Sequence, residues 1–182
     1  MIQHGKASAF LMAVAMAMVL AGSLSLGSGS RATAEDLPRE AVLPLALANK
    51  AASAALEKCR QDGYRVSVAV VDRAGLIRTL MRGDGAGPHT TDSSSKKAYT
   101  AASLRRPTSE LAEMISKMPA LQSLRDMNEK ILMLGGGLPI EIAGEVVGGI
   151  GVGGAPGAHL DDACAHAGLD SIGATPKSSG TK

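Results

Sequence analysis

The side chains best suited to chemistry surround a glycine-rich stretch in the middle of the chain. Residues 83–87 read Gly-Asp-Gly-Ala-Gly, and His89 follows them shortly before a predicted helix. The start of a helix offers free N–H groups and a positive dipole end, so this junction could hold an anionic group. A histidine at such a place could also donate a nitrogen to haem iron. An ordinary strand-to-helix connection with a solvated histidine would explain the same residues.

Three cations flank this junction. Arg82 ends the segment before it, and Lys96 and Lys97 lie in the predicted helix after it. Such cations pair with carboxylates, including the propionates of a haem group. The stretch lacks the Gly-Lys-Ser/Thr element of a Walker loop. We therefore predict that His89, Arg82, Lys96 and Lys97 bind a cofactor, with His89 as the candidate ligand to haem iron.

Other kinds of chemistry find little support in the sequence. There is no Gly-x-Ser-x-Gly elbow, and no Cys-x-x-Cys-His motif for covalent attachment of haem. His159 and His166 are seven positions apart on the last predicted helix. That spacing separates them by about 10 Å along the helix axis, too far for one metal ion. We predict no catalytic residue, and any haem would be held noncovalently.

The two cysteines, Cys59 and Cys164, are candidates for a disulfide. In an exported chain, two cysteines favour a disulfide because the compartment is oxidising. The alternative is a pair of buried thiols that act as small hydrophobic side chains.

The first 34 residues have the pattern of a secretory signal peptide. Lys6 precedes an apolar run at residues 9–24, and Ala32-Thr33-Ala34 is a small-x-small cleavage site before Glu35. The alternative is a membrane anchor, but the run 9–21 is short for a spanning helix, which needs about 20 apolar residues. We therefore expect a periplasmic or secreted protein that has no membrane span after cleavage.

The composition of the mature chain argues against nucleic acid as a partner. The signal peptide contains two of the 19 basic residues, Lys6 and Arg31, and none of the 17 acidic ones, so the mature chain is formally neutral. A neutral chain offers no electrostatic attraction to phosphates. The only aromatic residues after the signal peptide are Tyr64 and Tyr99, too few for a base-stacking surface.

Hydrophobic periodicity predicts an α-β-β-α-α-β-β-β-α order of elements. This order indicates an α+β domain, at residues 35–173, with a five-stranded antiparallel sheet flanked by helices. Residues 174–182 are small and polar, and we predict a disordered tail there. Thr91 or Asp92 is expected to cap the second predicted helix, at 92–104. The predicted elements are helix 43–61, strands 65–72 and 76–82, helices 92–104 and 108–117, strands 131–134, 138–143 and 145–152, and helix 159–169.

Several stretches together resemble one known family. In their order and spacing they are similar to the GlcG/HbpS-like family of haem-binding or haem-degrading proteins, over about residues 43–172. The stretches are Val68–Gly75, Arg82–Ala86, Lys97–Ala102 with Pro107-Thr108, Gly136–Ile140 and Gly144–Gly154.

The resemblance implies a five-stranded antiparallel sheet with a profilin-like or PAS-like layout. It also implies a homo-oligomer that holds its ligand near subunit contacts. We therefore expect an exported haem- or iron-binding protein that holds a tetrapyrrole noncovalently. The alternatives are a haem-degrading or small-metabolite enzyme, and an oligomeric sensor or interaction protein without a ligand.

Overall fold

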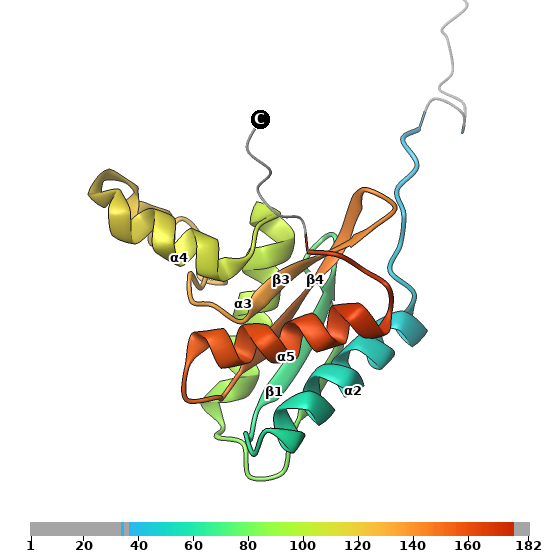
Figure 1. Ribbon diagram of the computed structural model, residues 1–182. Helices are drawn as coiled ribbons and strands as arrows, with labels where there is room; N and C mark the ends of the chain where they lie inside the picture. The colour runs from blue at the N-terminus through green and yellow to red at the C-terminus, as the bar shows by residue number, and fades with distance from the viewer. Residues whose placement is uncertain (1–33, 35–36, 177–182) are drawn as a thin grey trace, which may run out of the picture. The chain divides into compact units, whose positions relative to one another are not determined.

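The computed structural model describes residue 34 and residues 37–176 (Figure 1). Every helix and strand given below lies in the compact unit that begins at residue 40. The predicted signal peptide, residues 1–34, lies outside the described residues apart from Ala34. No helix in the described part of the chain is long and apolar enough to cross a membrane.

The element order follows the predicted one except at a single strand. A 3-10 helix, η1, also lies between α4 and β3, outside the predicted helices. The elements are α2 (Leu45–Gln61), β1 (Ser67–Asp72), β2 (Ile77–Arg82), α3 (His89–Leu104), α4 (Thr108–Lys117), η1 (Pro119–Asp126), β3 (Gly137–Ile142), β4 (Glu145–Gly153) and α5 (Ala158–Ser171).

The sheet is antiparallel throughout and has the strand order β2-β1-β4-β3. The predicted α+β class with an antiparallel sheet and flanking helices is therefore confirmed. The prediction of five strands is wrong, because the sheet has four. The missing strand is the short apolar run at residues 131–134.

Residues 131–134 have other partners for their backbone. The Leu132 N–H donates to the Thr100 hydroxyl at 2.8 Å, and the Leu134 carbonyl accepts from the Thr108 hydroxyl at 2.7 Å. Because threonine side chains satisfy these groups, the segment needs no strand beside it. A short apolar run has the same sequence pattern whether it forms a strand or pairs with side chains in this way. The segment packs instead on a small apolar cluster that contains Leu111, Ile115, Met133 and, half-buried, Ile131.

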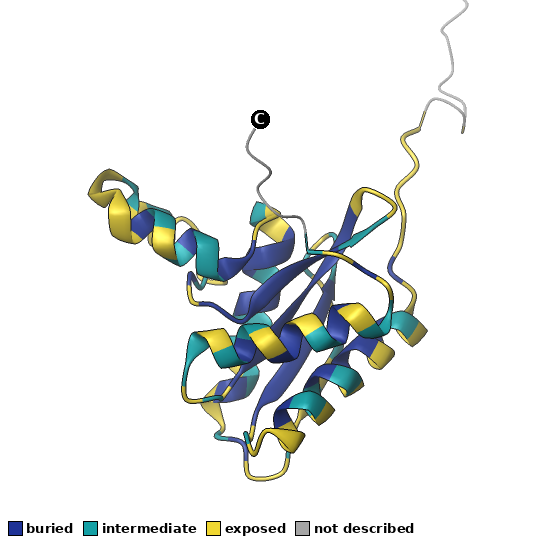
Figure 2. Cartoon of the chain, in the orientation of Figure 1, coloured by how far each residue is buried: buried dark blue, intermediate teal, exposed yellow. Residues whose placement is uncertain are grey.

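Helices cover both faces of the sheet (Figure 1). α2 and α5 lie side by side on one face and α3 lies on the other. Figure 2 shows the strands largely buried and the outward faces of α2 and α5 exposed. The larger core lies under α2 and α5, and includes Ala48, Ala52, Val68, Val70, Ile140, Ile150, Val152 and Leu169.

On the α3 face, glycines of β4 let the helix backbone lie directly on the sheet. A Cβ on Gly151 would overlap the Ser94 carbonyl oxygen, and one on Gly149 would lie 2.9 Å from the Ala102 nitrogen. The interleaved glycines of this strand therefore mark a close backbone approach, as their spacing indicates.

α3 begins at His89, three residues before the predicted start. The predicted capping residues Thr91 and Asp92 consequently lie inside the helix, and the Thr91 hydroxyl donates to the Pro88 carbonyl at 3.0 Å. Pro88 has φ −61° and no N–H that needs a partner, so the helix starts there without a side-chain cap.

The domain continues to at least residue 176. Thr175 exchanges two backbone hydrogen bonds of 3.2 Å with Glu141 of β3, and Ala174 is buried. The predicted disordered tail therefore starts too early at residue 174, because these backbone groups pair with a sheet edge. Residues 177–182 lie outside the described residues.

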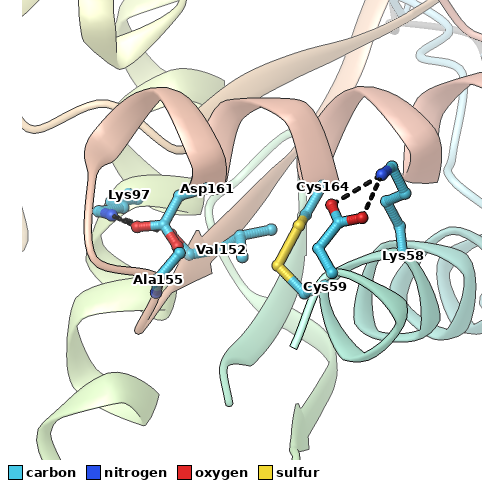
Figure 3. The surroundings of a disulfide bond; sticks show 8 residues. Lys58, Cys59, Lys97, Val152, Ala155, Asp161 and Cys164 are labelled. Atoms are coloured by element: carbon cyan, nitrogen blue, oxygen red, sulfur yellow. Dashed lines mark hydrogen bonds and ion pairs between the residues drawn. A yellow bond between two sulfur atoms is a disulfide. The ribbon is translucent and has the colours of Figure 1, made fainter. Parts of the chain in front are cut away.

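A disulfide joins α2 to α5. Cys59 and Cys164 are bonded across 105 positions of sequence, and both are fully buried (Figure 3). Small residues bring the two helices together, since a Cβ on Gly168 of α5 would lie 2.8 Å from the Ala51 carbonyl oxygen of α2.

A buried ion pair joins α3 to α5. The Lys97 ammonium donates to Asp161 Oδ2 at 2.7 Å and to the Val152 carbonyl at 2.9 Å (Figure 3). The other oxygen of Asp161 accepts the Ala155 N–H at 3.0 Å. Burial raises the pKa of Asp161, and the hydrogen bond from Lys97 opposes that rise. Each charged group thus has partners in place of water, as burial of an ion pair requires.

Reducing the disulfide should lower the free energy of unfolding by about 4 kcal/mol, because the closed loop is long and its chain entropy is restored in the unfolded state. Urea unfolding with and without dithiothreitol measures this. The variant with both Cys59→Ala and Cys164→Ala is the control, since the reductant should not change its midpoint. Equal midpoints for the oxidised and reduced wild type would contradict the prediction.

Removing one partner of the buried pair should cost about 3–5 kcal/mol, because Lys97→Met leaves Asp161 buried without a counter-ion. Adding Asp161→Leu to Lys97→Met should restore most of the loss. Lys58→Ala is the matched control, because it breaks the exposed pair with Asp62 and should cost less than about 1 kcal/mol. Urea midpoints that are equal for Lys97→Met and Lys58→Ala would refute the assigned role.

Candidate functional site

A cavity in the described residues lies where the end of α2 meets the end of β2. Its volume is about 390 Å³. Three segments contribute to it: the last turns of α2, the connection from α2 to β1, and the start of the glycine-rich loop after β2. The lining residues are Leu56, Arg60, Gly63, Tyr64, Arg65, Val66, Arg82, Gly83 and Asp84. We call this the arginine cavity.

Local backbone geometry brings the three segments together. Gly63 ends α2 with φ +84°, and the Tyr64 N–H then donates to the Cys59 carbonyl at 2.8 Å. This reversal at the helix end is one that glycine makes easily. At the other side, the Gly83 N–H donates to the Val66 carbonyl at 2.9 Å. The loop therefore leaves β2 directly beside the start of β1.

The lining of the arginine cavity has a net positive charge, with three arginines against Asp84, and Glu57 outside the lining partners one of them. Arg60 is held by Glu57 through two hydrogen bonds of 2.7 Å, which lower the pKa of Glu57 to about 2. Arg82 donates two hydrogen bonds to the Ala86 carbonyl, at 2.9 and 2.5 Å. These contacts hold Arg60 and Arg82 in place beside the cavity.

His89 does not line the arginine cavity. It is the first residue of α3 and is exposed. Its imidazole lies against the backbone of Gly87, where a Cβ would be 2.7 Å from the ring. Arg82 is bonded to the loop at Ala86, and His89 follows this loop at the start of α3, outside the lining of the cavity. The predicted role of His89 as an iron ligand stays a prediction.

Lys96 lies at a second, smaller cavity of about 190 Å³ on the α3 side. Its ammonium pairs with Asp92 at 3.2 Å. Lys130 lies 5.5 Å from the centre of the Tyr99 ring at the same cavity. The structure therefore places Lys96 with Tyr99 and apart from Arg82.

Lys97 is the predicted site residue whose environment differs most from the expected one. It is almost fully buried, and its ammonium is bonded to Asp161 and Val152 in the pair described above. In this subunit the side chain is therefore engaged in holding α3 to α5. The helix period explains the difference, because Lys96 and Lys97 are adjacent and must point in different directions.

Sequence reasoning missed Arg60, Tyr64 and Arg65. Arg60 lies in the last turn of α2, and Tyr64 and Arg65 lie in the connection to β1, far from the glycine-rich loop in sequence. The run Arg60-Gln-Asp-Gly-Tyr-Arg65 does concentrate arginine beside one of only two tyrosines. This concentration of arginine and tyrosine is the feature of the sequence that could have indicated a site. Only the fold shows that the run lines the same cavity as Arg82. No group of three or more metal-ligating side chains occurs in the described residues.

Comparison with known proteins places the chain in a family. Residues 43–170 match the family model described as haem degrading protein HbpS-like. A structure of a double mutant of HbpS from Streptomyces reticuli is 45% identical with a TM-score of 0.72, over 78% of this chain and 94% of that one. A structure described as a PduOC:heme complex is 25% identical with a TM-score of 0.71, over 76% and 100% of the chains.

The chain is also similar in sequence to a protein of Escherichia coli. Protein GlcG of Escherichia coli K12 is 31% identical over 118 residues, which is 61% of this chain and 81% of the relative. The resemblance seen in the sequence is therefore confirmed, and the chain belongs to the HbpS-like family.

Proposed function

We propose that this chain binds haem noncovalently in the arginine cavity. The observation that carries the proposal is the cluster of Arg60, Arg65 and Arg82 around a cavity of about 390 Å³. Membership of the HbpS-like family and the likeness to a haem complex support the choice of ligand. The cavity volume lies within the usual range of small-molecule sites, about 300–1,000 Å³.

The chemistry of the lining suits each part of a haem group. Guanidinium groups pair with the two propionate carboxylates through forked hydrogen bonds. Leu56, Val66 and the Tyr64 ring give apolar contact for the edge of the macrocycle. The two cysteines are joined to each other and are not available for thioether links. Haem would supply a redox-active iron, while the chain supplies charge, apolar walls and a ligand atom.

We also propose that the protein works outside the cytoplasm as a homo-oligomer. The signal-peptide pattern at residues 1–34 and the disulfide both support export, because disulfides persist in oxidising compartments. Apolar side chains on edge strand β2 support assembly, since Ile77 is 55% exposed and Leu80 is 41% exposed. A ligand held near such subunit contacts would be partly covered by a second copy.

Haem degradation is a second candidate function, favoured by the description of the family itself. It would require a reductant from outside the chain. Under ascorbate, a Soret band that persists supports binding alone, and a band that decays with release of iron supports degradation.

Hemin added to the mature protein should give a shifted and saturable Soret band. Arg82→Glu should weaken binding by at least about tenfold, because it replaces a propionate partner with a repelling carboxylate, and each 1.4 kcal/mol corresponds to a tenfold change. A spectrophotometric titration measures both effects.

Lys96→Glu is the matched control for this titration, because it makes the same change of charge at the other cavity. It should leave hemin affinity nearly unchanged. Thermal melting of both variants checks that they are folded. If Lys96→Glu weakened binding as much as Arg82→Glu, the arginine cavity would be the wrong location, and the propionate role predicted for Lys96 from the sequence would be favoured. No Soret shift with the wild type would reject haem binding.

Expression of the full chain in a Gram-negative host should give a periplasmic protein whose first residue is Glu35, because signal peptidase cleaves after the small-x-small site. N-terminal sequencing of the periplasmic and membrane fractions tests this. A chain that retains residues 1–34 in the membrane fraction would support the anchor and contradict the proposal.

A further inference from the structure

The arginine cavity contains only two side chains that can ligate iron. Of its nine lining residues, Tyr64 offers a phenol oxygen and Asp84 offers a carboxylate, while the others are arginine, glycine, leucine or valine. His89 is not among them. If haem occupies this cavity, its protein ligand should therefore come from Tyr64 or Asp84.

Tyr64 is held more firmly than Asp84. Its backbone N–H is bonded to the Cys59 carbonyl, next to the disulfide, and its half-buried ring packs against the main core. Asp84 lies exposed in the glycine-rich loop. A ligand on a rigid support fixes the iron position, whereas a hydrated loop carboxylate must first be ordered and desolvated.

The Tyr64 hydroxyl is also free to take this role. None of the hydrogen bonds between described residues uses this hydroxyl, and the side chain is half-buried at the cavity. The guanidinium groups of Arg60, Arg65 and Arg82 line the same cavity. Their positive charges offset the negative charge that a phenolate would bring beside two propionates. Tyrosine is a known protein ligand of haem iron.

We propose that Tyr64, rather than His89, is the protein ligand to ferric haem in this chain. The inference rests on the proposed function, since it assumes haem in the arginine cavity. On binding, the phenol releases its proton to solvent, and the phenolate oxygen replaces water or hydroxide on the hemin iron. The oxidation state of the iron does not change.

The test compares hemin complexes of the wild type with those of Tyr64→Phe, Tyr99→Phe and His89→Ala. Resonance Raman and absorption spectra report the ligand, and titration reports the affinity. The wild type should show iron–phenolate bands. Tyr64→Phe should lose them and bind hemin at least about tenfold more weakly, as loss of a metal-site group typically does. Tyr99→Phe is the matched control in the second cavity and should match the wild type.

A second variant keeps the test decisive if Tyr64→Phe folds poorly. Tyr64→His should bind hemin and change its spectrum to that of an imidazole complex, which a purely structural role for Tyr64 would not produce. If His89→Ala changes the spectrum and Tyr64→Phe does not, the proposal is overturned while haem binding stands. If the wild type gives no Soret shift, haem binding itself fails and the ligand proposal fails with it.

Discussion

The close contact between α3 and β4 is the constraint on which the rest of the fold depends. α3 lies on a strand whose positions 149, 151 and 153 carry no side chain, so backbone meets backbone where side chains would normally intervene. This contact leaves no room for even a methyl group at Gly151. It also lets Lys97 extend past the sheet to Asp161, so that a helix on one face is bonded to a helix on the other.

Packing on the opposite face of the sheet also depends on residues with small side chains or none. Alanines of α2 and Gly168 of α5 bring two helices close enough for the Cys59–Cys164 disulfide to join them. The end of α2 is thereby fixed, and with it the turn that carries Tyr64. The arginine cavity lies beside this fixed end, where the glycine-rich loop leaves β2. A rigid support on one side and a short loop on the other suit the flat, charged ligand proposed for this cavity.

Much of this architecture could be predicted from the sequence. Strong periodicity identified the helices and four of the strands, because amphipathic helices and buried strands carry distinct patterns. The run 131–134 was misread, since threonine hydroxyls from two helices satisfy its backbone and nothing local shows this. The start of α3 also lies earlier in the chain than predicted. Its N-cap is Pro88, so the helix lacks the polar capping side chain that sequence rules look for.

The candidate site was predicted only in part. The sequence pointed to the loop after β2 and to Arg82, which does line the cavity. It grouped His89, Lys96 and Lys97 with Arg82 because they are near in sequence, whereas the turn of α3 sends them to three different environments. Tyr64, Arg60 and Arg65 were missed because they come from the end of another helix. Which loop ends meet in space is a property of the whole sheet, and spacing along the chain does not encode it.

The most direct test of the account is the position of iron in a crystal of the hemin complex, located by anomalous scattering at the iron edge. The account predicts one iron per subunit within coordination distance of Tyr64 Oη, with the propionates toward Arg65 and Arg82. An iron bound at the Lys96 and Tyr99 cavity, or ligated by His89 away from the arginines, would contradict it.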